Sequence, residues 1–144
     1  MKQGKNTVNP EPYKWKEEYK VDISVIDEQH KKFLNIINEL KLIINTGSCT
    51  KKIPAIFYQI AYLIDNYFLK EEIYFKDCQY PNFEQHQTQH NLFIKQITQF
   101  QKDFENKKDN LCLDIYNYLE HWFNEHILEY DKEAAEFLKQ KGVN

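Results

Sequence analysis

The chain has 144 residues, of which 42% are hydrophobic and 15% aromatic, with only three glycines and four prolines. This composition is typical of one compact helical domain, and it excludes a disordered chain or a turn-rich β-sandwich. The net charge of −3, carried without a single arginine, gives no basic surface for nucleic acid or for a membrane.

The cysteines and the apolar runs indicate the cellular setting. No apolar run approaches the ~18 residues of a membrane span, and no secretory leader is visible. The chain has three cysteines, Cys49, Cys78 and Cys112, which lie far apart in the sequence. Their number is odd, and no two of them form a CxxC motif. We therefore expect reduced, half-buried cysteines with no disulfide framework or zinc knuckle, and a cytoplasmic protein. Cys78 precedes a turn, so we expect it to be the cysteine most open to oxidation.

The segments in chain order are an arm and four helices. Residues 1–14 are polar with two prolines, which predicts an extended N-terminal arm before a domain at 15–144. Four segments follow in which apolar residues recur at steps of three and four, the periodicity of a helix. The stripes contain Ile26, His30, Phe33, Ile37, Leu40 and Ile44; Ile56, Ile60, Leu63, Tyr67, Glu71 and Tyr74; Phe83, His86, His90, Phe93, Ile97, Phe100 and Phe104; and Leu111, Ile115, Tyr118, Trp122 and His126.

Short breaks separate these stripes. Gly47 is a C-cap glycine, residues 80–82 form a sharp turn with Asn82 as a candidate N-cap, and residues 106–110 form a polar loop. Short connections force neighbouring helices to run antiparallel. The sequence therefore predicts an all-α protein, an antiparallel up-down-up-down four-helix bundle, with a short C-terminal helix at about residues 132–141 that ends at Gly142.

Ionisable residues interrupt the apolar stripes at inward positions: His30, Glu71, His86, His90 and His126. A lone inward histidine is usually a satisfied core residue. Burying all five unpaired would cost several kcal/mol each, against a net stability of roughly 5–15 kcal/mol. A metal centre would compensate them. Imidazole and carboxylate without thiolate favour iron, zinc or manganese.

The spacing of these residues sets a structural requirement. His86 and His90 lie about 40° apart on one helical face, so both can reach one ion. Asp131 follows His126 by five residues, which on an ideal helix places it about 140° away. Both can face the same ion only if the helix loosens through a π-bulge or ends there. A ferritin-like di-iron bundle would carry Glu-x-x-His, and none of these histidines has glutamate three residues earlier.

Six elements of the sequence resemble the hemerythrin family, in the family's order, over about residues 15–138. They are Trp15; Ile26-Asp27-Glu28-Gln29-His30-Lys31; Phe68-x-x-Glu71-Glu72; Tyr80-Pro81; His86-x-x-x-His90; and Trp122-x-x-x-His126-Ile127-x-x-x-Asp131. The resemblance implies two non-haem iron ions with an oxo or hydroxo bridge. It implies that His86, His90 and His126 hold one iron, that His30 holds the other, and that Glu71 and Asp131 bridge them.

The resemblance also implies O2 binding at an open position on the second iron. An apolar pocket would shield that position from water, formed here by Phe33, Phe68, Trp122, Phe123 and Ile127; each of these also has an ordinary role in core packing. His121 lies five residues before His126 and is expected on the surface.

One position departs from the family. The family carries His-Phe-x-x-Glu-Glu on its second helix, whereas this chain has Tyr67-Phe68-Leu69-Lys70-Glu71-Glu72. In the favoured interpretation Tyr67 binds the second iron as a phenolate, whose negative charge favours the ferric state. In the other interpretation Tyr67 points inward unbound and leaves a further open position on that iron, which is a strong Lewis acid.

These features give three hypotheses about function. The leading one is a non-enzymatic di-iron protein that binds O2 as carrier, store or sensor, with redox behaviour altered by Tyr67. The alternative is a di-iron redox enzyme that handles peroxide or nitric oxide. The third, a metal-free helical interaction domain, conflicts with the buried histidines. We expect O2 or a related small molecule as the partner, neither nucleic acid nor membrane, and a monomer.

Overall fold

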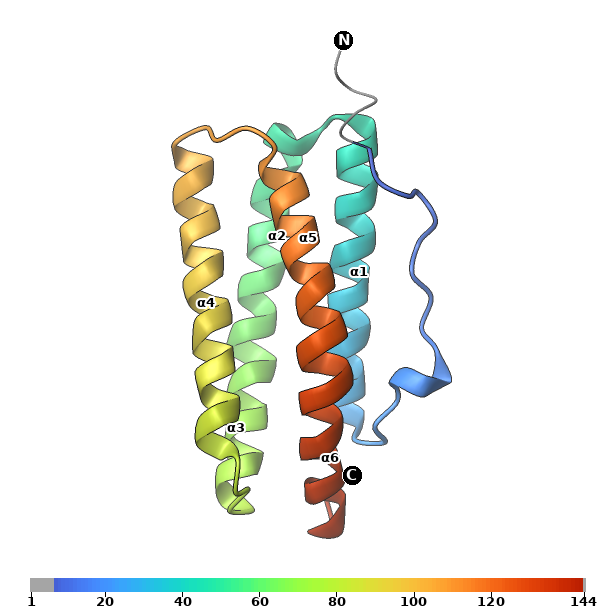
Figure 1. Cartoon of the computed structure of the whole chain (residues 1–144), viewed down its shortest axis with the longest axis vertical. Coiled ribbons are helices and arrows are strands. Elements are labelled where there is room, and N and C mark those ends of the chain that lie inside the picture. Colours follow the sequence, from blue (N-terminus) through green and yellow to red (C-terminus); the bar gives the residue numbers. More distant parts are fainter. Residues whose placement is uncertain (1–6, 144) are drawn as a thin grey trace.

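The fold is described for residues 7–143 by a computed structural model, and within that range the regular elements are all helical. Figure 1 shows four rods side by side, each running opposite to the rod before it in the chain. The predicted all-α bundle is thus confirmed. Residues 1–6 of the predicted arm lie outside the described range.

Each rod consists of one or several helical segments. A 3₁₀ turn, η2 (Glu17–Tyr19), precedes the bundle. The first rod is α1 (Ser24–Thr46), and the second joins α2 (Cys49–Leu63), the π-helix η3 (Ile64–Phe68) and α3 (Leu69–Asp77). The third rod is α4 (Phe83–Glu105), and the fourth joins α5 (Leu111–Trp122), the π-helix η4 (Phe123–Asp131) and α6 (Lys132–Gln140).

The ends of α1 and α4 follow from their residues. Gly47 ends α1 at φ 67°, a left-handed conformation that glycine adopts without strain, and its N–H bonds back to Ile43 and Ile44. Asn82 lies at the N-cap position of α4, but its side chain donates to Glu133 at 3.3 Å rather than to the helix. The glycine cap is confirmed, and the asparagine links two rods instead.

The predicted C-terminal helix is present as α6 (Lys132–Gln140), but it is continuous with the π-helix before it. Asp131 and Lys132 keep right-handed helical dihedrals, so α6 continues η4 without a turn. The apolar periodicity of the fourth rod fails after His126. The π-helix explains that failure, since its i→i+5 hydrogen bonds change the phase of the side chains.

The expectation of three reduced cysteines is wrong for two of them. Cys49 and Cys112 form a disulfide, with Cα atoms 6.0 Å apart, while Cys78 is free and half-buried. Each bonded cysteine lies in the first turn of a helix directly after a connection. The first and third connections of this bundle lie at the same end, which brings the two cysteines together despite 63 residues of separation.

The apolar core consists of two clusters separated by a polar layer. The larger cluster includes Phe33, Leu40, Ile60, Phe93 and Ile115, and extends toward the disulfide end. The smaller cluster lies at the opposite end and contains Val21, Ile23, Ile26, Phe75, Tyr80, Ala134, Ala135 and Leu138. The ionisable residues lie between the two clusters along every rod, so apolar packing encloses them from both ends.

Candidate metal centre

The inward ionisable residues converge in two groups of ligand atoms. One group joins His86, His90, His126 and Asp131, and the other joins His30, Glu71 and Asp131; within each, the ligand atoms lie within 4.8 Å of one another. All four rods contribute. His30 comes from α1, Glu71 from α3, His86 and His90 from α4, and the remaining two from η4.

The π-helix η4 is what brings His126 and Asp131 onto one face. Their five-residue spacing would separate them on an α-helix, but it matches the i→i+5 repeat of a π-helix. Nε2 of His126 lies 3.0 Å from Oδ1 of Asp131. The predicted loosening of this helix is therefore confirmed, in its π-bulge form.

The two carboxylates each face both groups. Oδ1 of Asp131 lies 3.1 Å from Nε2 of His86, while its Oδ2 lies 2.9 Å from Nε2 of His30. Oε1 of Glu71 lies 3.2 Å from Nε2 of His90 and 3.5 Å from Nε2 of His86, and Glu71 also belongs to the His30 group. This is the arrangement that two ions sharing two carboxylates require.

The atoms around the centre have unmet bonding capacity. Among the residues the structure describes, six buried side-chain atoms have no hydrogen-bond partner, and five of them face this cluster: Glu71 Oε1, His86 Nε2, His90 Nε2, His126 Nε2 and Asp131 Oδ1. A buried polar atom without a partner costs about 1–3 kcal/mol. Cations bound among these atoms would remove that cost.

The spacing of the ligand atoms fits transition ions. Bonds of about 2.1 Å to nitrogen and oxygen place neighbouring ligands of an octahedral ion about 3.0 Å apart. Most of the nitrogen-to-oxygen distances in the cluster lie between 2.9 and 3.2 Å. The donor set contains imidazole and carboxylate without thiolate, which suits iron, zinc or manganese.

Without metal, the shifted pKa values leave negative carboxylates beside positively charged imidazoles in the centre. Burial and Asp131 raise the pKa of the Glu71 carboxyl, but the imidazoles of His86 and His90, 3.5 and 3.2 Å from its Oε1, outweigh them and lower it to about 2. Burial lowers the pKa of His86, but Asp131 and Glu71 outweigh it and raise it to about 10. The pKa of His90 is raised as well, whereas burial lowers that of His126. A cation must therefore displace protons from two of these imidazoles.

Hydrogen bonds behind the ligands fix their orientation. Nδ1 of His90 donates to Oε2 of Glu72 at 2.8 Å, and Gln87 donates to the other oxygen of Glu72 at 3.1 Å. Nδ1 of His126 donates to the side-chain oxygen of Gln89, and Gln29 donates to Glu71. These bonds direct the Nε2 atoms into the centre, the usual role of such outer partners.

Sequence reasoning assigned no role to these outer partners. Glu72 and Gln29 were parts of quoted motifs, and Gln87 and Gln89 were not singled out. A helix-phase argument could have placed Gln87 beside Glu72 only after the register of α3 against α4 was known.

The residues predicted to form an apolar pocket are packed near the imidazoles. Phe68 stacks on His90 with ring centroids 4.0 Å apart, and Trp122 stacks on His126 at 4.1 Å. The ring centroid of Phe33 lies 5.6 Å from that of Trp122 and 6.2 Å from that of Phe123. Ile127 is also buried. His121 lies on the surface as expected, with 68% of its side chain exposed.

Tyr67 has a different partner from the metal ligands. Its ring is buried, and its hydroxyl donates to Oε1 of Glu28 at 3.3 Å. Burial and Glu28 raise the pKa of the Tyr67 phenol, so the group is protonated at neutral pH without metal.

Comparison with known proteins identifies the family. The hemerythrin HHE cation binding domain matches residues 21–138. The chain belongs to the hemerythrin family. This membership implies a non-haem di-iron site and, at family level, O2-binding-type function.

Individual relatives agree with this assignment. The chain is 30% identical over 123 residues to a bacteriohemerythrin of Clostridium acetobutylicum, covering 83% of this chain and 95% of that one. It is 23% identical to a bacteriohemerythrin of Stenotrophomonas maltophilia, covering 87% and 80%. It is 27% identical over 88 residues to a myohemerythrin of Theromyzon tessulatum, covering 61% and 68%.

Proposed function

We propose that this hemerythrin-family chain binds O2 at a di-iron centre, as carrier, store or sensor. The supporting observation is the set of unpartnered, buried nitrogen and oxygen atoms that face one another between the two apolar clusters. His86, His90 and His126 would hold one iron, His30 the other, and Glu71 and Asp131 both. The bound pair, with its oxo or hydroxo bridge, would supply the electrons that O2 binding requires.

The protein's own residues would exclude water and orient the ligands. Phe33, Phe123 and Ile127 are buried beside the stacked pairs Phe68–His90 and Trp122–His126. An apolar wall admits O2, which needs no hydrogen bonds, and disfavours water. Glu72, Gln89 and Gln29 would hold their three ligands while iron changes oxidation state.

We propose that Tyr67 sets the chemistry of the second iron. Binding as a phenolate requires its hydroxyl to leave Glu28 and lose its proton, against a raised pKa. A bound cation supplies that driving force. Phenolate charge would then favour the ferric state and shorten the life of the O2 complex.

The second candidate function, a redox enzyme acting on peroxide or nitric oxide, is favoured by the Tyr67–Glu28 hydrogen bond. If that bond persists with iron present, the second iron keeps a further open position. Small oxidants would enter that position, and turnover rather than storage would follow.

The visible spectrum of the iron-loaded protein tests both proposals, compared with Tyr67→Phe. Phenolate ligation predicts a charge-transfer band that disappears in the variant. An identical band-free spectrum in both proteins rejects ligation. Mixing the reduced protein with O2 then separates the functions: a species that releases O2 under vacuum supports carriage, and prompt oxidation without release contradicts it. Tyr58→Phe, which changes an exposed tyrosine on the same rod, is the matched control.

A further inference from the structure

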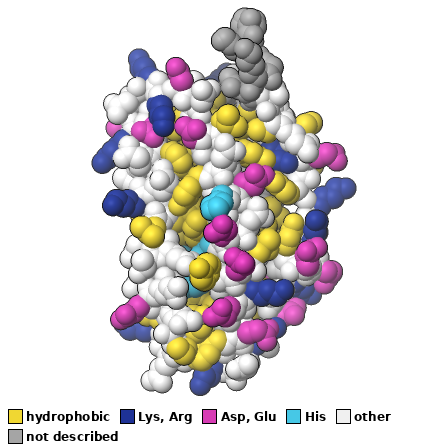
Figure 2. All heavy atoms as spheres, in the orientation of Figure 1, with side chains coloured by type: hydrophobic (Ala, Val, Ile, Leu, Met, Phe, Trp, Pro, Cys, Tyr) yellow, Lys and Arg dark blue, Asp and Glu magenta, His cyan; other side chains and the backbone are white. Residues whose placement is uncertain are grey.

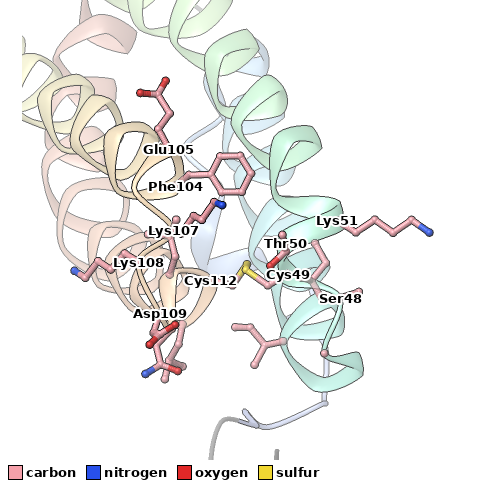
Figure 3. A pocket seen from close by; sticks show the side chains of 16 residues that line it. Ser48, Cys49, Thr50, Lys51, Phe104, Glu105, Lys107, Lys108, Asp109 and Cys112 are labelled. Atoms are coloured by element: carbon pink, nitrogen blue, oxygen red, sulfur yellow. A yellow bond between two sulfur atoms is a disulfide. The ribbon is translucent and has the colours of Figure 1, made fainter.

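We propose that the Cys49–Cys112 disulfide is a thiol–disulfide exchange site, opened by a small dithiol reductant. The disulfide lies at the end of the bundle opposite the smaller apolar cluster and away from the metal centre. It lines a surface cavity of about 960 Å³, formed where the first and third connections meet. Figure 3 shows the sulfur atoms between the two helix ends, with Lys51 directed away from them.

The two cysteines of the disulfide differ in how accessible they are. Cys49 is half-buried, whereas Cys112 is buried at 2% exposure. An attacking thiolate can therefore reach the sulfur of Cys49 through the cavity more readily than that of Cys112. Exchange proceeds by in-line approach of a thiolate to one sulfur. The difference in exposure therefore favours attack on Cys49.

The reduced form of the cysteine pair is stabilised by its position at two helix N-termini. Cys49 is the first residue of α2, a helix of 15 residues, and Cys112 is the second residue of α5, a helix of 12 residues. The N-terminus of a helix carries partial positive charge and stabilises a thiolate. Lys107 and Lys108 also line the cavity, accompanied by the acidic Glu105 and Asp109. Two thiolates favoured at helix N-termini make the disulfide easier to reduce than one between neutral loops.

The exchange between the reductant and the disulfide takes place in two steps. One thiolate of the reductant attacks the sulfur of Cys49, the Cys49–Cys112 bond breaks, and its electron pair leaves on the sulfur of Cys112. The second thiol of the reductant then attacks the mixed disulfide and releases Cys49. The protein gains two electrons and two protons, and the dithiol becomes a cyclic disulfide.

An exchangeable disulfide is compatible with the predicted cytoplasmic location. Persistent structural disulfides are rare in the cytoplasm, whereas exchangeable ones occur there. Exchange would also make the cross-link at this end of the bundle depend on redox conditions. α2 leads into η3 and Glu71, and α5 leads into η4 with His126 and Asp131, so the disulfide ties together the two rods that carry both shared carboxylates.

The test uses the full-length folded chain in a Cys78→Ser background, which leaves the disulfide as the sole pair of cysteines. We expect free thiols to be absent after purification in air, to appear under native conditions with millimolar dithiothreitol, and to disappear when the oxidised form of the reagent is added. Circular dichroism should keep its helical signal throughout. A disulfide that resists reduction until denaturant is added overturns the proposal, and so does the finding of free thiols in air.

Single replacements test the predicted order of attack. Cys112→Ser leaves Cys49 alone, and Cys49→Ser leaves Cys112 alone. We expect alkylation of Cys49 to be about tenfold faster than alkylation of Cys112, because Cys49 is half-buried and Cys112 is buried. Equal rates, with helicity intact in both variants, would contradict the assignment of Cys49 as the attacked sulfur. Thiol counting needs no iron, so this test stands apart from the proposed O2 function.

Discussion

At the scale of single residues, the centre depends as much on outer partners as on ligands. His90 is held by a carboxylate, Glu72, while His126 is held by a neutral amide, Gln89. A negatively charged acceptor makes an imidazole a stronger donor to a metal than a neutral acceptor does. We infer that the two histidines bind the same iron with unequal strength.

The first prediction concerns Glu72. Glu72→Gln keeps a hydrogen-bond acceptor for His90 but removes its charge, so the affinity for iron should fall about 10-fold or more. Competition with a coloured chelator measures the affinity. Glu84→Gln, an exposed position on α4, should leave it unchanged. An unaltered affinity in Glu72→Gln would show that the charge of this carboxylate has no part in metal binding.

Sequence reasoning was strongest for residues that break a periodic pattern. His30, Glu71, His86, His90 and His126 were recognised because they occupy apolar positions. The disulfide was missed because cysteine pairing depends on proximity in space. One signal was available: Cys49 and Cys112 each lie near the start of a helix after a connection, and in an up-down bundle these two connections meet at one end.

At the scale of elements, the N-terminal arm is held by side chains of α1. Asn38 binds both backbone groups of Tyr13, accepting from its N–H at 2.7 Å and donating to its carbonyl at 2.9 Å. Asn45 binds Val8 in the same way, at 2.8 and 2.9 Å. Between them, the buried Lys41 donates to the carbonyl of Glu11 at 2.6 Å. These amides replace the sheet partners that an extended segment would otherwise need.

We predict that Asn38→Ala destabilises the protein by about 1–3 kcal/mol, because two partly buried backbone groups of Tyr13 lose their partner. Urea denaturation followed by circular dichroism measures this change. Asn35→Ala, on the same helix but exposed, should change the free energy of unfolding much less. Equal effects of the two replacements would contradict a specific role for Asn38 in holding the arm.

The arm also gives an expected pH dependence. Tyr13 and Tyr116 both donate to Glu120, the latter at 2.9 Å. Burial and Glu120 raise the pKa of Tyr116 to about 12 and that of Tyr13 further still. Free phenol has a pKa near ~10. Stability from these bonds should be complete below pH ~10 and fall as the pH rises through the raised values.

Ultraviolet titration of the phenols checks this prediction. The wild type should show tyrosines that ionise well above the rest, and Tyr13→Phe should remove one of them and lessen the alkaline loss of stability. Ionisation of Tyr13 together with the exposed tyrosines would contradict the described contacts with Glu120.

Element boundaries could be predicted where a local signal exists and not elsewhere. Gly47 marked the end of α1, and the five-residue spacing of His126 and Asp131 required the π-helix. No comparable constraint predicted η3, the π-helix that carries Tyr67 and Phe68, because its residues keep an apolar pattern. The contacts of Asn38 and Asn45 were also invisible, since polar residues on a helix usually indicate a solvated face.

At the scale of the whole molecule, the bundle is a polar layer between two apolar clusters. Figure 2 shows lysines and acidic residues interspersed over one face, without a large area of a single sign. No helix in the described range is both long and apolar enough to cross a membrane. The candidate metal ligands lie inside, where the four rods bring them together.

The central claim is that this interior holds two irons, and an anaerobic titration of the metal-free chain with ferrous iron tests it most directly. We predict that two irons per chain remain bound after gel filtration, and that protons are released during binding because the pKa values of His86 and His90 are raised without metal. Asp131→Ala should lose both irons, since that carboxylate faces both groups. Retention of no iron by the wild type, or of one iron with no effect of Asp131→Ala, would contradict the di-iron account.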